Sequence, residues 1–223
     1  MTLSSERHLV EAVTRGDRAA LGQLLARYQH RLYNVVLRMV SHRDDAAEVT
    51  QDAMVKIIEN IDHFRGDSQV GTWMIRIAMN LSISHLRRRQ TRQMMSLDAE
   101  RPGNGQTDNP DPPGTLGDRI ADTRELSPEA RVQRDELVAQ LHRAMNRLEP
   151  DFRAALVLRD IDDMDYQQMA EVLGIPLGTV KSRLFRARLA LRQEMATADA
   201  HVPTNAHGLP TVGPHRLGGG SHD

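Results

Sequence analysis

The stretch that decides the fold of the C-terminal half is YQQMAEVLGIPLGTVKSRLFRAR, Tyr166–Arg188. Asp165 precedes it and Gln168 lies three residues later, which is the spacing of a capping box at the start of a helix. Gly174 then ends this helix, because a residue without a Cβ readily adopts the left-handed conformation just past a C-cap. Pro176 has a fixed φ that suits the start of a second helix. The sequence therefore predicts a helix, a tight turn and a second helix.

The second helix of this pair has two faces of different chemistry. Val180, Leu184, Ala187 and Leu191 recur at three- and four-residue intervals and form an apolar face that we expect to be buried. The opposite side carries cations, a hydroxyl and an aromatic ring, which suit phosphates, base edges and a thymine methyl in a major groove. The candidate DNA contacts are Thr179, Lys181, Ser182, Arg183, Phe185 and Arg186. A solvated basic face on an ordinary helical hairpin is the alternative, but the combined spacing of cap, glycine, proline and cations favours DNA recognition.

The composition limits the fold class. Of the 223 residues, 39% are hydrophobic and only 3% are aromatic. A core must therefore be built from aliphatic residues and Met, most of which are good helix formers, and this predicts an all-α fold. The chain has no cysteine, which excludes disulfides and thiolate chemistry and fits a reducing compartment. Because no apolar run reaches membrane-spanning length, we expect no membrane span and a cytoplasmic protein.

Patterns typical of catalysis are absent from the sequence. No Gly-rich phosphate loop follows a strand, and no nucleophile elbow or histidine pair at metal spacing lies on an expected helix. The sequence therefore predicts no enzyme activity, no cofactor and no metal site. The net charge of −1 argues against a uniformly basic nucleic-acid binder, so any binding of DNA must come from local patches.

Residues 1–94 predict a first helical domain. Asp17 is placed to cap one of its helices, and Asp44 and Asp45 lie in the first turn of another, where the helix dipole favours acidic residues. Taken alone, the polar face of that second helix is an ordinary solvated surface. It displays Glu48, Gln51 and Asp52.

A basic segment closes the first domain. A helix expected from Thr72 ends in HLRRRQTR, residues 85–92, whose arginines are too closely spaced to pair with carboxylates on the same helix. Their mutual repulsion calls for a polyanion or for water. Trp73, the only tryptophan, lies upstream, and an aromatic ring beside a basic groove commonly holds single-stranded bases. A buried core tryptophan is the alternative.

Helical periodicity disappears over residues 95–127, which contain the run RPGNGQTDNPDPPGTLGD. Such a composition cannot build a core and predicts a flexible acidic linker. Residues 128–196 predict a second helical domain that contains the helix-turn-helix, with Pro128 at the first position of a helix. Residues 197–223 are poor in apolar side chains and predict a disordered tail. The expected architecture is two small helical domains joined by a flexible linker.

Three segments together resemble one protein family. GTVKSRLFRAR, Gly178–Arg188, closely resembles the region-four helix-turn-helix of bacterial sigma factors of the extracytoplasmic-function type. DDAAEVTQDAMVKIIENIDHF, residues 44–64, resembles the polymerase-binding helix of region two, and FRGDSQVGTWMIRIAMNLSISHLRRR, Phe64–Arg89, resembles its promoter-melting segment. The resemblance covers most of residues 21–92 and 126–192 in the family's order. It implies a factor that binds core RNA polymerase and directs it to promoter DNA.

The resemblance also implies roles for the candidate residues. Glu48, Gln51 and Asp52 would bind the clamp of the largest polymerase subunit. The minus-ten promoter element would meet Trp73, Arg76, Asn80, Ser82, Arg87 and Arg88. The minus-thirty-five element would meet the candidate DNA contacts of the helix-turn-helix, and an anti-sigma factor is left open as a further partner. Met74 stands where primary sigma factors carry a second aromatic residue, which puts an aromatic wedge for DNA melting in doubt.

Two alternatives remain at this level. A conventional helix-turn-helix regulator that binds duplex DNA without polymerase explains residues 166–188 but leaves the arginine-rich segment and the acidic helix without a role. An anti-sigma-like adaptor predicts protein binding without promoter contacts. Binding of promoter DNA with and without core polymerase separates the three readings.

Overall fold

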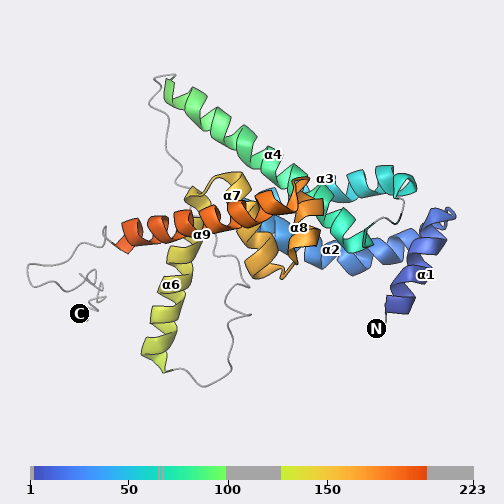
Figure 1. Ribbon diagram of the computed structural model, residues 1–223, viewed down its shortest axis with the longest axis horizontal. Helices are drawn as coiled ribbons and strands as arrows, with labels where there is room; N and C mark the ends of the chain where they lie inside the picture. The colour runs from blue at the N-terminus through green and yellow to red at the C-terminus, as the bar shows by residue number, and fades with distance from the viewer. Residues whose placement is uncertain (1–2, 65, 67, 99–126, 200–223) are drawn as a thin grey trace, which may run out of the picture.

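The computed structural model describes residues 3–64, 66, 68–98 and 127–199 (Figure 1). Every regular element in these ranges is helical, which confirms the predicted all-α fold. The elements are α1 (Leu3–Thr14), α2 (Arg18–Val40), α3 (Arg43–Asn60), η1 (Ile61–His63), α4 (Val70–Asp98), α6 (Pro128–Arg147), α7 (Pro150–Leu156), η2 (Val157–Ile161), α8 (Tyr166–Leu173) and α9 (Leu177–Asp199). In this part of the chain, no helix combines the length and the apolar character needed to cross a membrane.

Helices α1 to α4 build the first domain. α2 begins as predicted after Asp17, whose carboxylate accepts hydrogen bonds from the backbone N–H of Ala19 at 2.8 Å and of Ala20 at 3.0 Å. α4 packs against both α2 and α3, so the core is shared among three helices. The largest side chains that are fully buried in this domain are aliphatic residues and methionines, as the composition required: Leu24, Leu32, Met39, Ile57, Met74, Ile75 and Met79.

Helix α4 is longer than the sequence indicated. It begins at Val70 and continues to Asp98, past the expected end of the first domain at residue 94. Among the described side chains of α4, Leu86 is the last buried one. Beyond it, Arg, Gln and Met are strong helix formers, and no Gly or Pro occurs between Leu86 and Pro102. The helix therefore continues without a core beneath it, and Met94 is 69% exposed.

The second domain consists of α6 to α9. Ser127 caps α6 by accepting the backbone N–H of Ala130 at 3.3 Å, directly before Pro128. At α8 the predicted capping box is present, since the Asp165 carboxylate accepts the N–H of Gln168 at 2.8 Å and the Gln168 side chain accepts the N–H of Asp165 at 3.0 Å. Gly174 follows with φ 64°, so the turn has the left-handed residue that the sequence predicted.

A five-residue π-helical turn, η2, follows α7, and two carboxylates, one in the turn and one directly after it, have different partners. Asp160 pairs with Arg188 of α9, with 2.5 Å between Oδ1 and Nη2. Asp162, one residue beyond the turn, pairs with Arg31 of α2 at 2.8 Å. The turn therefore connects to its own domain on one side and to the first domain on the other.

The two domains lie against each other. α7 and α8 pack on α4, and η2 packs on α2 (Figure 1); we call this contact of α2 and α4 with α7, α8 and η2 the domain seam. Buried apolar side chains from both domains form one continuous cluster. The sequence indicated two domains and a linker but not this contact. The expected linker over residues 99–126 and the expected tail from residue 200 onward lie outside the described residues.

Candidate nucleic-acid interface

The outward face of α9 carries most of the residues expected to contact the minus-thirty-five element. Val180, Leu184 and Ala187 are buried against the domain. On the other side Lys181, Ser182 and Arg186 are exposed, Thr179 is half-buried, and the Phe185 ring is 67% exposed. An aromatic side chain left this open on a rigid helix is available for an apolar contact with a ligand.

Arg183 differs from its neighbours on α9. Its side chain is only 21% exposed, and its Nη1 lies 3.6 Å from Oδ1 of Asp151 at the start of α7. By contrast, Arg186 donates its Nε–H to the carbonyl of Ser182 at 3.4 Å, within its own helix. One cation of the expected set is thus held by a carboxylate, whereas Arg186 remains on the open surface.

The expected minus-ten residues on α4 are divided between surface and core. Arg76 and Asn80 are exposed. Trp73 is half-buried and packs against Phe64, with 5.4 Å between ring centroids and 51° between ring planes. The tryptophan therefore has a packing partner in the first domain while part of its ring remains accessible.

Ser82 differs from the other expected minus-ten residues because it is buried. It is fully buried, and its hydroxyl donates to the carbonyl of Ala78 at 2.8 Å. α4 is packed on one side by α2 and α3 and elsewhere by α7 and α8, and the i, i+4 series Ala78, Ser82 and Leu86 lies entirely in the core. Ser82 is therefore a small residue that fits a crowded helix face, and it presents nothing to DNA in this structure.

The arginine-rich end of α4 is engaged in three different ways. Arg87 pairs with Asp151 of α7 at 2.7 Å. Arg88 donates its Nε–H to the carbonyl of Ser84 at 3.3 Å. Arg89 lies 3.4 Å from Asp45 of α3. Carboxylates from α7 and α3 thus neutralise part of the arginine cluster, for which the sequence indicated no partner on its own helix.

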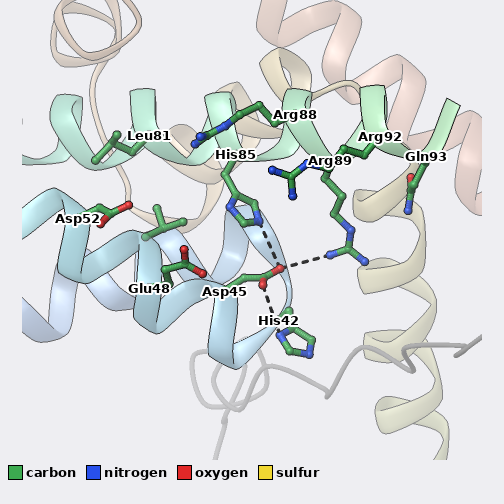
Figure 2. Close-up of a pocket in the computed structure, with 11 residues that line it drawn as sticks. His42, Asp45, Glu48, Asp52, Leu81, His85, Arg88, Arg89, Arg92 and Gln93 are labelled. Atoms are coloured by element: carbon green, nitrogen blue, oxygen red, sulfur yellow. Dashed lines mark hydrogen bonds and ion pairs between the residues drawn. The ribbon is translucent and has the colours of Figure 1, made fainter. Parts of the chain in front are cut away.

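A cleft of about 580 Å³ is lined by α3 and α4 beside their contact (Figure 2). Its α3 wall is acidic and its α4 wall is basic, so charges of opposite sign face each other across it. The polar residues that line the two walls are His42, Asp45, Glu48 and Asp52 on one side and His85, Arg88, Arg89, Arg92 and Gln93 on the other. Residues expected to bind polymerase and residues expected to bind DNA therefore border the same cleft.

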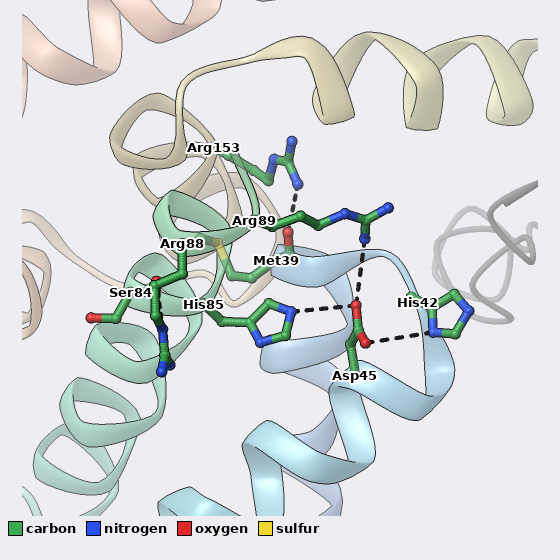
Figure 3. A network of polar contacts seen from close by, with 8 residues as sticks. All are labelled: Met39, His42, Asp45, Ser84, His85, Arg88, Arg89 and Arg153. Atoms are coloured by element: carbon green, nitrogen blue, oxygen red, sulfur yellow. Dashed lines mark hydrogen bonds and ion pairs between the residues drawn. The ribbon is translucent and has the colours of Figure 1, made fainter. Parts of the chain in front are cut away.

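Asp45 joins the two walls (Figure 3). Its Oδ2 lies 3.3 Å from Nε2 of His85 and 3.4 Å from Nη1 of Arg89, and its Oδ1 lies 3.9 Å from Nδ1 of His42. The sequence explained this carboxylate only by its place in the first turn of α3. The cross-helix role was missed because the partners are some forty residues away and share no periodicity with it.

A second feature that the sequence did not reveal is the apolar surface of α3. Val55 is 50% exposed and Ile58 is 49% exposed, and both lie one turn or two from Gln51 and Asp52. On the neighbouring side, a groove of about 540 Å³ runs between α2 and α3 and includes Gln51 in its lining. Exposed β-branched residues beside a row of polar side chains are typical of a protein-binding surface.

Comparison with known proteins decides the family. Residues 24–92 match the family model for Sigma-70 region 2, and residues 139–191 match the model for Sigma-70, region 4. The RNA polymerase sigma-H factor of Pseudomonas aeruginosa is 36% identical over 191 residues, which is 86% of this chain and 94% of that protein. The ECF RNA polymerase sigma-E factor of Escherichia coli K12 is 35% identical over 192 residues, 84% of this chain and 92% of the relative. The chain belongs to the extracytoplasmic-function (ECF) sigma factors.

Solved structures share the fold of this ECF sigma factor. The sigma factor RpoE of Bartonella quintana, in complex with the anti-sigma factor NepR, matches with a TM-score of 0.54 and 25% identity over 80% of this chain and 97% of that one. CnrH, in complex with the cytosolic domain of CnrY, shares the fold with a TM-score of 0.54. The family resemblance read from the sequence is confirmed, and the protein is a sigma factor that directs transcription initiation. A helix-turn-helix regulator without a region-two domain does not account for the match over residues 24–92.

Proposed function

We propose that this ECF sigma factor binds core RNA polymerase through α3 and reads promoter DNA with α4 and α9. It acts by binding alone, without catalysis of its own, in the cytoplasm where the bacterial chromosome lies. The observation that carries the proposal is the joint match of the region-two and region-four models, in the family's order, to the two domains that bear the candidate surfaces.

The proposed polymerase surface is the exposed side of α3. Glu48, Gln51 and Asp52 are exposed there, next to the apolar Val55 and Ile58. Protein interfaces usually have apolar side chains at the centre and polar ones around them. The apolar side chains lose water on binding, and the polar ones select the partner. We assign this surface to the clamp of the largest polymerase subunit.

The proposed DNA surfaces lie on two helices. On α9, the minus-thirty-five element would meet the six residues expected from the sequence, Thr179, Lys181, Ser182, Arg183, Phe185 and Arg186. On α4, the minus-ten element would meet Trp73, Arg76, Asn80, Arg87 and Arg88, without the buried Ser82. The outward position of Phe185 and Arg186 on α9 supports the first surface, and the exposure of Arg76 and Asn80 on α4 supports the second.

An anti-sigma factor is proposed as a further partner. The Bartonella quintana sigma factor was solved with its anti-sigma factor NepR and is similar to this chain over both domains. A protein that occupies α3 would exclude the polymerase clamp from the same residues.

Transcription in a purified system tests the polymerase surface. We expect run-off transcripts when the protein is added to core polymerase and a matching promoter, and no specific promoter binding by the free protein. Charge reversal at two positions, Glu48→Lys with Asp52→Lys, should abolish co-purification with core polymerase because it places like charges on a docking surface. Glu11→Lys, on the exposed side of α1, is the matched control. Unchanged co-purification of the double variant would remove the clamp assignment, and equal promoter binding without polymerase would favour a conventional regulator.

Substitution on α9 tests the minus-thirty-five surface. Arg186→Ala should weaken the binding free energy for the minus-thirty-five element by about 1–3 kcal/mol, since a bidentate base contact is lost. The variant should also discriminate less between sequences at that element. Arg192→Ala, also exposed on α9 but outside the proposed set, should lower transcription much less. An equal loss on every promoter sequence would identify Arg186 as a phosphate contact.

A further inference from the structure

A pocket of about 300 Å³ lies where α2, α4, α6 and α7 meet, and we call it the seam pocket. It lies beside the larger cleft of α3 and α4, with which it shares His42, Arg89 and Gln93. A pocket of this volume is at the lower limit of ligand sites in proteins, so it suits a small molecule. The other polar residues of its lining are Ser41, Gln90, Asn146 and Arg153.

The seam pocket has the electrostatic character of an anion site. Its permanently charged lining groups are the guanidiniums of Arg89 and Arg153, and no carboxylate of the described residues lines it. The neighbouring cleft differs, because Asp45, Glu48 and Asp52 line its α3 wall. The other polar lining groups are side-chain amides, a hydroxyl and an imidazole, all of which can donate hydrogen bonds. The lining therefore complements a negatively charged ligand.

Arg153 is a buried charge whose protein partners carry no full negative charge. Its residue is only 4% exposed, and it donates to the carbonyl of Met39 at 2.6 Å and to the carbonyl of Asn146 at 2.5 Å (Figure 3). Its Nε is buried and has no hydrogen-bond partner among the described residues. Burial, with the charge of Arg89 as a second cause, lowers the pKa of Arg153 to about 10, so the guanidinium stays charged at neutral pH. A buried charge is costly unless an opposite charge accompanies it, and an anion in the pocket would supply that charge.

Two further groups of the seam pocket have donors to offer. Arg89 contacts Asp45 through Nη1 at 3.4 Å, which is one of the five N–H donors of a guanidinium. The Ser41 hydroxyl donates to Oδ1 of Asn146 at 2.5 Å, so the NH₂ group of that amide remains as a donor. Guanidiniums bind phosphate through a planar fork of N–H groups. Donors that come from α4, α6 and α7 suit a ligand with oxygens in several directions, as a phosphate group has.

We propose that the seam pocket binds the phosphate group of a small anion, inorganic phosphate or a phosphomonoester, between Arg89 and Arg153. A phosphodiester of DNA offers similar oxygens, but it is flanked by sugars on both sides, and a pocket of about 300 Å³ around a buried guanidinium favours the smaller ligand. The inference does not depend on the proposed polymerase and DNA surfaces. Because a ligand of the folded state stabilises it, phosphate should raise the melting temperature of the full chain.

Calorimetric titration of the full-length protein tests the site. The probes are inorganic phosphate and glycerol phosphate, in a chloride buffer at neutral pH and constant ionic strength. We expect saturable binding of one anion per chain and a saturable rise in melting temperature, which chloride at the same ionic strength does not produce. In nitrogen-15 NMR spectra, the Nε–H signal of Arg153 should move during the titration.

Arg89→Gln should weaken phosphate binding about tenfold or more, because a charge-assisted contact is lost. Arg92→Gln is the matched control. It removes the same charge from an exposed position of α4 that lines only the neighbouring cleft, and it should change the affinity less than about twofold. Equal losses in the two variants would mean general attraction by the arginine-rich helix and would overturn the proposal.

A substitution that increases affinity keeps the proposal falsifiable if Arg89→Gln misfolds. Asp45→Asn removes the carboxylate that competes for Arg89 and should tighten phosphate binding about twofold to fivefold, a gain that misfolding does not produce. Asp44→Asn removes the same charge at an exposed neighbouring position and should have a smaller effect. The proposal is overturned if the two variants behave alike or if neither small anion binds saturably. It is also overturned if short single-stranded DNA, and neither probe, shows the dependence on Arg89, because that result would assign the arginine to the DNA backbone.

Discussion

Helices α4 and α9 carry the two proposed DNA surfaces, but they are anchored in opposite ways. α9 rests on its domain by one stripe, Val180, Leu184 and Ala187, and leaves the opposite side open. α4 is packed by helices of its own domain and by α7 and α8 of the other, so its exposed positions are fewer. The comparison shows that a helix packed on several sides exposes only a few positions to a ligand, whereas a helix packed on one side exposes a whole face.

The largest effect should come from the buried stripe of α9. Leu184→Ala removes a side chain that is 2% exposed and should lower the free energy of unfolding by about 2–5 kcal/mol, because it leaves a cavity. Its neighbour Phe185→Ala should change that free energy by less than about 0.5 kcal/mol yet reduce transcription from a matching promoter. Urea unfolding of both variants measures the contrast. Equal destabilisation would mean that α9 does not have the open face described.

The next effect concerns the enclosure of α4. A Cβ added at Gly71 would lie 2.8 Å from Cε1 of Tyr28, and that ring is fixed by a 2.9 Å hydrogen bond from its hydroxyl to Glu6. Gly71→Ala should therefore destabilise the protein by about 1–3 kcal/mol through overpacking. Gly22→Ala is the matched control, since nothing lies within 4 Å of a Cβ there, and it should stabilise α2 by roughly 0.5–1 kcal/mol. A thermal melt that ranks the two variants in reverse would contradict this packing.

A smaller effect is expected at α8, which touches both helices under comparison. Asp165→Ala removes the capping box and should cost about 0.5–2 kcal/mol of stability. Asp165→Asn keeps an acceptor for the N–H of Gln168 and should restore most of the loss. Hydrogen exchange of the α8 amides gives the measurement, and equal protection in both variants would show that the cap does not stabilise the helix.

The smallest effect is a dependence on pH through His142 of α6. Burial, with the charge of Arg38 of α2 as a second cause, lowers the pKa of His142. Below about pH 6.5 the unfolded chain then binds more protons than the folded one, so the stability contributed by neutral His142 should fall as pH falls through the folded-state pKa. His142→Gln should flatten this part of the stability profile, and His30→Gln, at an exposed position of α2, should not. Identical profiles for both variants would exclude His142 as the cause.

Local chemistry explains which features of the two helices could be predicted. The capping pair Asp165 and Gln168, the left-handed Gly174 and the outward Phe185 all depend on residues within one helical turn or two, and the structure has each as expected. The existence of two domains followed from the loss of periodicity after residue 94. These signals can be read without knowing which helices pack against each other.

The remaining features depend on long-range contacts. In the sequence, Ser82 resembles a polar surface residue. It is buried because other helices enclose α4, and its hydroxyl is satisfied by the carbonyl of Ala78. Asp45 and Asp151 look like acidic first-turn residues of their helices, and nothing near them in the sequence points to His85 or Arg87. Periodicity describes one helix at a time, so it cannot reveal partners that lie on another helix.

The π-helical turn η2 sets a limit on how the chain length can vary during evolution. Removal of one residue between Val157 and Ile161 should rotate the following residues by about 100° relative to α7 if the helix is otherwise regular. This change would misdirect Asp162 and displace the helix-turn-helix of α8 and α9. Insertions and deletions among relatives should therefore avoid this turn and accumulate elsewhere, such as between Gly66 and Val70. An alignment of relatives should therefore show the same number of residues in this turn, even where the sequences around it differ.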